Sequence, residues 1–571
     1  MQKYAMRERK KEDLVEHLLF HRGIKNAEDT EKFLNPDYAK HTHDPFLMKD
    51  MEKAVERIVR AMQNNERIAI FSDYDADGIP GAVVLHDFFK KIGYANFENY
   101  IPDRHGEGFG LNAGAIEELA ERGAKLLITI DCGIADTEEV SRANNLGMEV
   151  IITDHHLLSH FIPPAYAILN PKQPDCSYPE KMLCGSGVVF KLVQALVLRL
   201  RSSTDYSLLA THLPLGFEKW LLDMVGLATL SDMVPLTGEN RVFAHFGLKV
   251  LRKSPRAGLG QLLQELRINR EDITEDDIGF MISPRINAAS RMGVPMDAFR
   301  LFATEDAAEA GALARHLNKI NDERKGKVAA LVKEVRKIVA EQQSSTISGQ
   351  APKVIVAGSP LWRPSLLGLV ANALVEDYKK PVFVWGREWN DTLKGSCRSD
   401  GSVDLSLLMH EARSVFSDFG GHKEAGGFSI ALERVHLLES ELERAYEKVN
   451  MSRELKPKYL VDARMSIDEV NWDVWNSIAK LAPFGVGNPK PLFLFEQVPV
   501  NRVDTFGKEK QHLKLIFNKK SVEKISAIKF YSKPDDFGGI VPGQNINLLA
   551  HLEKSVFGSY PELRLRIVDV M

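Results

Sequence analysis

Three carboxylates crowd into one short stretch of this sequence, Asp73-Tyr-Asp75-Ala-Asp77, directly before Gly78. Carboxylates this close together repel one another strongly unless a cation neutralises them. A bound divalent metal ion is therefore the chemistry that this stretch suggests. Asp-x-Asp also occurs often by chance, and the alternative interpretation is a loop whose Asp side chains cap a following helix.

Two further polar clusters follow apolar runs in the same way. Asp131 comes directly after the run 125–130, and Asp154-His155-His156 comes directly after the run 149–153, just as the first cluster follows the run 67–71. The three runs have the length and composition of buried strands. Ligands bind at the carboxyl ends of the strands in open α/β sheets, so we expect the three clusters to form one site. The neighbouring carboxylates favour His155 as a metal ligand over a structural histidine.

Carboxylate and imidazole ligands without thiolates favour Mn²⁺, Mg²⁺ or iron over a structural zinc ion. The number of carboxylates suggests two ions that share a bridging Asp, an arrangement that can clamp a phosphoryl group and activate water. No GxGxxG follows a predicted strand and no GxxxxGK[ST] is present, which argues against NAD and P-loop nucleotide sites.

Helical patterns separate the predicted strands, which indicates βαβ units and a parallel sheet. The predicted helices lie at 48–62, 80–92, 113–122 and 137–145, and the pattern from 188 to 230 is also mainly helical. A long helical tract runs from 305 to 343 and ends in a polar linker at 344–350. A second α/β segment follows at 352–450, then a short linker at 456–458. The chain from Tyr459 onward has many short β-like runs, as in a small barrel or sandwich.

The bulk composition is that of a soluble globular protein of several domains. The chain has 571 residues, with 44% hydrophobic and 27% charged residues and a net charge of −4. It has no apolar run of membrane-spanning length and no signal-peptide pattern at its start. Four widely spaced cysteines without a CxxC pair predict reduced, buried thiols in a cytoplasmic protein. The absence of a strong basic charge argues against a passive nucleic-acid coat.

The motifs resemble those of the DHH phosphoesterases. Asp73-Tyr-Asp-Ala-Asp-Gly, Ile130-Asp-Cys-Gly and Asp154-His-His are similar to the signature of that family. A further similar block lies between the first two of these at 101–111, and others follow at 183–190, 230–236 and 283–292. The segments 395–399 and 420–428 resemble a DHHA1-type domain, and 482–491 resembles the start of an OB-fold region. The likeness extends over nearly the whole chain and is greatest to bacterial single-strand-specific exonucleases of the family.

The resemblance implies a set of catalytic residues. It implies Asp75, Asp77, Asp131, His155 and Asp232 as metal ligands; Asp232 is inferred from the resemblance alone, because it follows a helical stretch far along the chain. His156 is implied to face the substrate phosphate as a charge stabiliser or proton donor. Asp73 and Asp154 are expected to orient the ligands. The expected catalytic residues are therefore His156, Asp131 and Asp154.

The resemblance also implies residues that grip the substrate strand near its 5′ end. Arginine suits phosphate capture, and hydroxyl and bare backbone N–H groups can cradle a phosphate. The implied nucleic-acid-binding residues are Arg285, Asn287, Arg291, Arg363, Ser396, Arg398, Gly420, Gly421 and His422. In the C-terminal region the candidates for stacking or strand tracking are Phe484, Lys490, Phe506, Lys508, Lys510 and His512.

Two departures from the family pattern affect expected phosphate contacts. Ile79-Pro80-Gly81 stands where a small hydroxylated pair is more usual, and Arg363 stands where relatives usually have a histidine after the tryptophan. Arg363 could still hold a phosphate but cannot exchange a proton near neutral pH.

We therefore expect an α/β protein with a parallel-sheet DHH domain, a DHHA1 domain joined to it by a long helix, and a β-rich OB-like domain. The expected boundaries are an N-terminal segment at 1–45, the DHH domain at 46–304, the connecting helix and linker at 305–350, the DHHA1 domain at 351–454 and the OB domain at 458–571. The implied function is 5′ to 3′ hydrolysis of single-stranded DNA to nucleoside 5′-monophosphates with two Mn²⁺ or Mg²⁺ ions, in DNA repair and recombination.

The expected protein is a cytoplasmic monomer without a membrane contact. Its expected partners are single-stranded DNA, a single-strand-binding protein and a helicase. Two alternatives stay open: a DHH phosphoesterase for small substrates, such as a nanoRNase or a cyclic-dinucleotide hydrolase, and an inactive scaffold in replication. The additional C-terminal domain argues against small substrates, and the intact ligand set argues against a scaffold.

Overall fold

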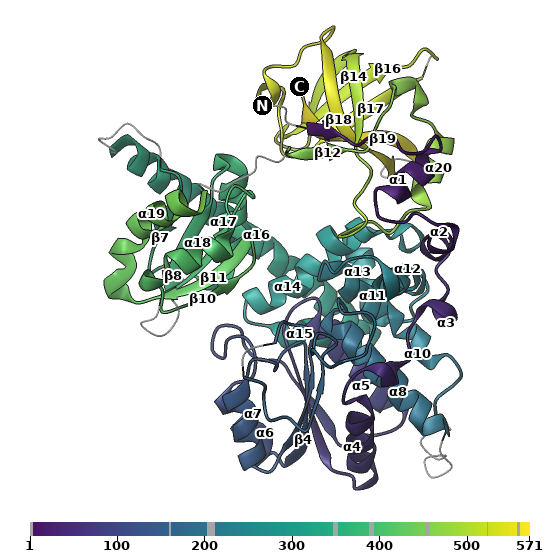
Figure 1. Ribbon diagram of the computed structural model, residues 1–571, viewed down its shortest axis with the longest axis vertical. Coiled ribbons are helices and arrows are strands. Elements are labelled where there is room, and N and C mark those ends of the chain that lie inside the picture. The colour runs from purple at the N-terminus through teal and green to yellow at the C-terminus, as the bar shows by residue number, and fades with distance from the viewer. Residues whose placement is uncertain are drawn as a thin grey trace. The chain divides into compact units, whose positions relative to one another are not determined.

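A computed structural model describes residues 4–158, 161–202, 212–345, 352–387, 393–450, 457–521, 523–556 and 560–571 (Figure 1). The chain divides into two compact units. The larger unit comprises Asp44–Asp232 and Leu248–Glu454, and the smaller comprises Met1–His43, Met233–Gly247 and Leu455–Met571. No helix within the described ranges is long and apolar enough to cross a membrane.

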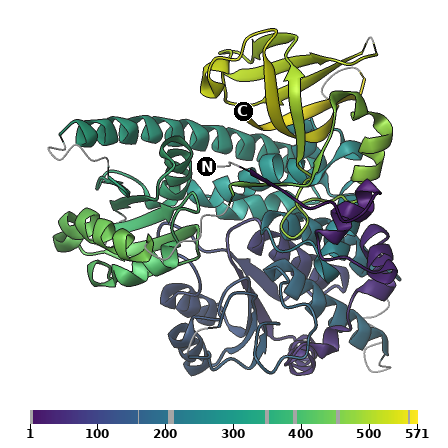
Figure 2. The same ribbon diagram turned by 45° about the horizontal axis from the view of Figure 1, so that its top comes forward.

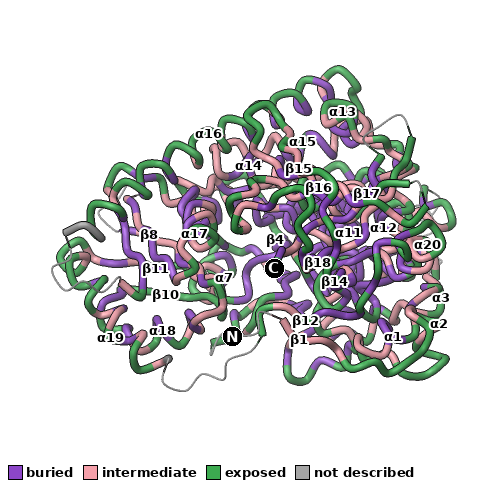
Figure 3. Tube along the Cα trace, turned by 90° about the horizontal axis from the view of Figure 1, so that it is seen from above, coloured by how far each residue is buried: buried purple, intermediate pink, exposed green. Residues whose placement is uncertain are grey.

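The larger unit begins with a sheet of five strands that all run parallel, in the order β3-β2-β4-β5-β6. The strands are β2 (Arg67–Ser72), β3 (Phe97–Tyr100), β4 (Ala124–Ile130), β5 (Glu149–Thr153) and β6 (Ala167–Leu169). β2, β4 and β5 are nearly continuous buried apolar runs, as expected for a parallel sheet covered on both faces. Figure 3 shows the burial of β4. These three strands were predicted, whereas β3 and β6 were missed: β3 is a half-buried edge strand and β6 has three residues.

Helices cover both faces of this sheet (Figure 1). On one face α6 (Ala113–Glu121) and α7 (Thr137–Asn145) pack on alternate side chains of β2, β4 and β5. On the other face lie α4 (Met51–Gln63), α5 (Gly78–Lys91) and α8 (Gly185–Ser202), which contact the same strands. All the helices predicted in this region are present.

A group of helices leads from this domain into the next. They are α10 (Phe217–Trp220), α11 (Leu222–Ser231), α13 (Ala257–Leu266), α14 (Ser283–Arg291), α15 (Pro295–Ala303) and α16 (Ala307–Ser345). Of α12 (Gly238–Leu251), residues 238–247 belong to the smaller unit and residues 248–251 to the larger. The predicted long helix is α16, a single helix of 39 residues (Figure 2). α13, α14 and α15 pack along it, and it also contacts α17 of the following domain. The first two residues of the predicted linker at 344–350 end this helix, and the others lie outside the described residues.

The second sheet of the larger unit is mixed, in the order β10-β11-β9-β8-β7, and only β7 and β8 run parallel. Its strands are β7 (Ile355–Gly358), β8 (Val382–Arg387), β9 (Leu393–Arg398), β10 (Asp418–Gly421) and β11 (Ala425–Ile430). α16 and α17 (Pro364–Tyr378) contribute to one apolar cluster with this sheet. α18 (Leu405–Glu411) and α19 (Leu438–Asn450) contribute to a second cluster.

The smaller unit contains a seven-stranded mixed sheet around one apolar core, in the order β13-β14-β18-β19-β17-β16-β15. Its strands are β13 (Ala463–Arg464), β14 (Phe493–Pro499), β15 (Arg502–Phe506), β16 (His512–Asn518), β17 (Lys524–Lys529), β18 (Asn545–Ser555) and β19 (Glu562–Val570). Residues near the N-terminus belong to this unit: β1 (Tyr4–Met6) pairs in parallel with β12 (Tyr459–Val461). Side chains from α1 (Leu14–Phe20) and α2 (Ala27–Leu34) enter the same core, which also receives α20 (Trp472–Ala479).

Candidate metal centre

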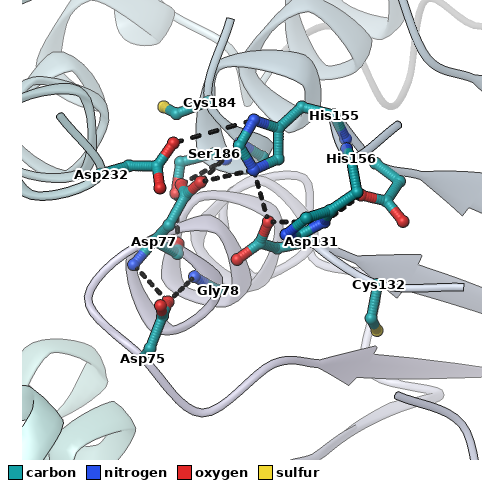
Figure 4. Close-up of polar contacts among 12 residues, drawn as sticks. Asp75, Asp77, Gly78, Asp131, Cys132, His155, His156, Cys184, Ser186 and Asp232 are labelled. Carbon is teal, nitrogen blue, oxygen red and sulfur yellow. Dashed lines mark hydrogen bonds and ion pairs between the residues drawn. The ribbon is translucent and has the colours of Figure 1, made fainter. Parts of the chain in front are cut away.

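Three acidic segments meet at the carboxyl edge of the parallel sheet (Figure 4). The backbone pairing continues one residue beyond the strands: Asp73 N–H donates to Ile130 O at 3.0 Å, and Asp131 N–H donates to Thr153 O at 2.9 Å. Asp154 N–H donates to Leu169 O at 3.0 Å. The three strand ends are therefore in register, as predicted from the sequence.

The loop between β2 and α5 is fixed by its own backbone and by α14. Asp75 Oδ1 accepts hydrogen bonds from Asp77 N–H at 2.8 Å and Gly78 N–H at 3.1 Å. A Cβ atom at Gly78 would lie 2.4 Å from Asp73 O, so only glycine allows this close return of the chain. Asn287 Oδ1 accepts from Ala76 N–H at 3.0 Å and holds the loop from outside.

Asp77 is held by the N-terminus of α8. Its two carboxylate oxygens accept hydrogen bonds from Gly185 N–H at 2.6 Å and Ser186 N–H at 2.8 Å. The Ser186 hydroxyl donates to Asp77 O at 2.5 Å. The free N–H groups at a helix N-terminus favour a negative charge, so α8 stabilises the carboxylate in this position.

His155 lies between three carboxylates from separate segments (Figure 4). His155 Nε2 lies 3.1 Å from Asp131 Oδ1 and 3.7 Å from Asp77 Oδ2. His155 Nδ1 lies 3.7 Å from Asp232 Oδ2, at the end of α11. Burial lowers the pKa of His155 and therefore favours the neutral imidazole that can bind a metal ion.

The ligand atoms form overlapping groups that could each hold a cation. Two groups, Asp77–His155–Asp232 and Asp73–Asp75–Asp131, together contain all five residues expected as ligands. The second group also includes Asp73, which was expected to orient ligands and not to face an ion. A third group joins Asp131 and His155 with His156. Asp131 and His155 each belong to two of the three groups.

The electrostatics of the site favour a bound cation. Burial and the neighbouring carboxylates raise the pKa of Asp73, Asp75 and Asp131. The same causes raise the pKa of Asp232 to about 8. Asp73 Oδ1, Asp131 Oδ1 and His155 Nδ1 are buried atoms that form no hydrogen bond with the described residues. Buried acceptor atoms without a partner are costly, and a divalent cation would satisfy the two carboxylate oxygens and an unprotonated Nδ1. The residues present therefore fit Mn²⁺ or Mg²⁺.

Asp154 positions His156. Asp154 Oδ1 accepts hydrogen bonds from His156 Nδ1 at 2.8 Å and His156 N–H at 3.0 Å, and Oδ2 accepts from Ile134 N–H at 3.0 Å. Although burial opposes it, the hydrogen bond to Asp154 raises the pKa of His156 to about 8. The His156 side chain is 46% exposed and lies 3.9 Å from Asp131 Oδ1. It thus lies at the open side of the cluster.

Several residues that hold the site were not found from the sequence. Lys172 Nζ donates to the backbone carbonyl of His155, and its charge also acts on Asp232. The Gly185 and Ser186 N–H groups bind Asp77, and a Gly-Ser-Gly stretch before an apolar helix could have indicated this. The Arg104 guanidinium lies 5.0 Å from the centre of the Tyr74 ring. No spacing rule could have linked Lys172 or Arg104 to the acidic loop.

The three residues expected on α14 have different surroundings. Arg285 is buried and donates to Met281 O at 2.8 Å and Asn318 Oδ1 at 3.0 Å, so its guanidinium joins α14 to α16. Asn287 contacts the acidic loop, as described above. Arg291 Nη1 donates to Ser365 O at 2.5 Å.

Arg291 belongs to a group of arginines. Burial and the charges of Arg104, Arg324 and Arg398 lower the pKa of Arg291 to about 9. Arg104 in turn acts on the pKa of Asp73 and lies near the acidic loop. We call Arg104, Arg291, Arg324 and Arg398 the arginine cluster. Like charges gathered in this way favour a bound anion.

The remaining expected residues lie in the second domain. Ser396 and Arg398 are on β9, and a Cβ atom at Gly368 of α17 would lie 2.9 Å from Arg398 Nη2. In the sheet, Gly420 pairs with Gly427 and Gly427 pairs with Ser396, so these residues lie in one row across three strands. Gly421 ends β10, and His422 follows it exposed. Arg363 is exposed at the N-cap of α17, where its side chain makes no capping hydrogen bond.

Of the candidate stacking residues in the C-terminal region, one is buried in the core and the others lie at least partly on the surface. Phe484 is buried in the core of the smaller unit and cannot stack on a ligand there. Phe506 and His512 are partly exposed and contact each other with ring centroids 5.0 Å apart. Phe530 and Tyr531 adjoin His512, and the Arg566 guanidinium lies 4.1 Å from the centre of the Phe530 ring. Lys490 is partly buried, while Lys508 and Lys510 are exposed in the β15–β16 turn.

The fold and the site define a protein of the DHH class, with a parallel-sheet domain that carries an acidic metal centre and a second α/β domain beside it. Residues 67–227 match the DHH family, N-terminal domain, and residues 351–451 match the DHHA1 domain. Residues 461–569 match the RecJ OB domain.

Relatives extend the match to the whole chain. The single-stranded-DNA-specific exonuclease RecJ of Bacillus subtilis is 35% identical over 97% of this chain and 67% of its own length. The RecJ of Salmonella typhimurium is 30% identical over 84% of this chain and 82% of its own. The chain belongs to the RecJ family.

Solved structures agree with this assignment. The crystal structure of RecJ in complex with Mn²⁺ from Thermus thermophilus aligns with a TM-score of 0.79 and 25% identity, covering 100% of this chain and 79% of that chain. A crystal structure of exonuclease RecJ bound to manganese aligns with a TM-score of 0.58 and 30% identity, covering 72% of this chain and 96% of that chain.

Proposed function

We propose that this protein is a metal-dependent exonuclease that degrades single-stranded DNA from its 5′ end. The observation that carries the proposal is the metal centre at the sheet edge with the arginine cluster beside its acidic loop. A cation site next to an anion site suits a substrate with two successive phosphates. Relatives named single-stranded-DNA-specific exonuclease match almost the whole chain, which supports the same substrate.

We infer that Asp75, Asp77, Asp131, His155 and Asp232 would hold the metal ions, with Asp73 close to Asp75 and Asp131. Bound Mn²⁺ or Mg²⁺ would neutralise the carboxylates, activate a water and stabilise charge on the phosphoryl group. His156 is the proton donor or charge stabiliser for the phosphodiester, because Asp154 holds its ring and keeps it protonated near neutral pH.

The arginine cluster would hold the 5′-terminal phosphate. Arg291 and Arg398 provide fixed positive charge, and the Ser396 hydroxyl and the backbone of Gly420 and Gly421 add donors from the neighbouring strands. His422 and Arg363 lie exposed near these elements and would contact the strand. Arg285 would support the same site by joining α14 to α16.

The smaller unit would bind the strand through the aromatic and basic surface around Phe506, His512, Phe530, Tyr531 and Arg566. Aromatic faces beside cations bind single strands without strong sequence preference. We further propose a monomer in the cytoplasm that acts in DNA repair and recombination. An enzyme that needs single strands requires another activity to open duplexes, which suits a helicase and a single-strand-binding protein as partners.

The test uses the full chain with Mn²⁺ and long DNA strands that carry either a 5′ or a 3′ label. Single nucleotides should be released at once from the 5′ label and late from the 3′ label, and a bulky 5′ block should protect the strand. Asp131→Ala should abolish this, whereas Asp175→Asn, which removes an exposed carboxylate outside the site, should not.

Two outcomes would contradict the proposal and favour one of the alternatives. Faster hydrolysis of dinucleotides or cyclic dinucleotides than of long strands would support the small-substrate alternative. Mn²⁺ binding without hydrolysis of any of these substrates would support the scaffold.

A further inference from the structure

Phe109 is a large apolar side chain that stays exposed beside the metal centre. The residue is 59% exposed, and its ring lies 5.9 Å from the ring of His156 in a T-shaped contact. Single exposed apolar residues are common on protein surfaces, so exposure alone means little. The construction of the loop that carries Phe109 is what distinguishes it.

The chain after Phe109 is anchored tightly. Gly108 and Gly110 flank it with φ angles of +86° and +80°, which other residues rarely adopt. Leu111 N–H donates to Asp136 Oδ2 at 2.7 Å, and a Cβ atom at Gly110 would lie 2.7 Å from the same oxygen. The Leu111 side chain then enters the core under the sheet, whereas Phe109 does not.

The chain before Phe109 is anchored as well. Glu107 accepts hydrogen bonds from Asp103 N–H and from the Tyr100 hydroxyl, both at 2.6 Å. The ring nitrogen Nε2 of His105 lies 3.0 Å from Arg291 O. The loop therefore runs from the arginine cluster, to which Arg104 belongs, to His156 at the metal centre, and both of its ends are fixed.

We propose that Phe109 stacks on a nucleobase that flanks the phosphodiester at the metal centre. The inference rests on the proposed function. A strand with one phosphate at the arginine cluster and the next at the metal ions would carry its bases along this loop. Phenylalanine has a π face but no hydrogen-bonding group, so it can hold any base without selecting one. The fixed loop presents the ring without a cost of ordering on binding.

The test measures single-turnover cleavage by the full chain with Mn²⁺ on strands with one abasic nucleotide. The abasic nucleotide is the first, the second, or one several places further along. At one of the two flanking positions, loss of the base should make the wild type cleave the strand about tenfold more slowly than the intact strand. Alanine scanning gives stacking effects of roughly 5- to 150-fold. Phe109→Ala should be slow on the intact strand and lose nearly all dependence on that base, and Phe109→Trp should restore it.

Leu146→Ala is the matched control. Leu146 is a partly exposed apolar residue at the C-terminus of α7, at the opposite edge of the sheet from the metal centre, and this variant should behave as the wild type. A purely structural role for Phe109 would slow cleavage of every strand equally and leave the abasic penalty unchanged, and that result would overturn the stacking. Wild-type cleavage that ignores both flanking bases would also overturn it while leaving the exonuclease proposal intact. Absence of any Mn²⁺-dependent cleavage would refute the proposed function itself.

Discussion

At Gly185, the addition of a single methyl group should displace a metal ligand. A Cβ atom at Gly185 would lie 2.6 Å from Asp131 Oδ1 and 2.8 Å from its Cγ, whereas ordinary contacts begin near 3.4 Å. The Asp131 carboxylate must then move by about 0.8 Å, several times the roughly 0.2 Å tolerance of metal–ligand distances. The backbone cannot easily absorb this, because Gly185 N–H and Ser186 N–H both hold Asp77.

We expect Gly185→Ala to weaken Mn²⁺ binding by about 10- to 100-fold, the size of effect seen when groups that orient metal ligands are lost. The rate of DNA hydrolysis should fall by about 100-fold, because a misplacement near 1 Å can have that effect. Titration calorimetry with Mn²⁺ and single-turnover hydrolysis measure the two quantities.

Gly187→Ala is the control on the same turn of α8. A Cβ atom at Gly187 would meet Leu183 Cβ at 3.5 Å and Cys184 Sγ at 3.6 Å, which are ordinary contacts. Both changes raise helix propensity by up to about 1 kcal/mol, so neither should lower the thermal stability of the helix itself. If Gly185→Ala binds Mn²⁺ and hydrolyses DNA as Gly187→Ala does, the reasoning about Asp131 is refuted.

Three further predictions follow from the contacts of the larger unit. Asn287→Ala removes the acceptor for Ala76 N–H and should reduce Mn²⁺ affinity about tenfold, as measured by calorimetry. An unchanged Mn²⁺ affinity would mean that α14 supports the fold and not the metal centre. Mn²⁺ binding at pH 7 should release about one proton or more, because the pKa of Asp232 is raised to about 8 and a bound ion requires the ionised carboxylate. Calorimetry in buffers of different ionisation enthalpy measures this release. A binding enthalpy that is the same in all buffers would contradict the prediction. Burial lowers the pKa of His86 to about 4, so its contribution to stability is present above pH 6.5 and is lost as the pH falls from 6.5 towards 4. Urea unfolding of the wild type and His86→Gln should therefore show that the variant gains up to about 2 kcal/mol relative to the wild type between pH 7 and pH 5, and a constant difference would contradict this.

The sequence predicted the part of the metal centre that depends on local order. Asp75, Asp131 and His155 follow buried apolar runs, and parallel strands bring their carboxyl ends to one edge, so three strands were enough to place them together. Asp232 is at the end of an apolar helix far along the chain, and only tertiary packing brings it within 3.7 Å of His155. Family resemblance predicted it, whereas spacing could not.

The same distinction applies to the fold. The helices and strands with strong periodicity were predicted to within a few residues. The edge strand β3 was missed because it is only half-buried, and β6 was missed because three residues are too few to show a periodic pattern. The pairing of β1 with β12 joins residues separated by most of the chain, and no local pattern contains that information. Among the candidate binding residues, Arg285 and Phe484 have suitable side chains, but burial gives them structural roles.

The metal centre is held in place largely by groups that would not touch the metal ions. The α8 N-terminus fixes Asp77, Asn287 fixes the loop of Asp75, and Lys172 fixes the backbone of His155. These groups keep carboxylates close together even though burial raises the pKa of Asp131 and Asp232 and opposes their ionisation. The gathering of these carboxylates is electrostatically unfavourable in itself, and a bound divalent ion would offset it. Since these supports come from separate helices and loops, a change in any of them should alter metal affinity before it alters the fold.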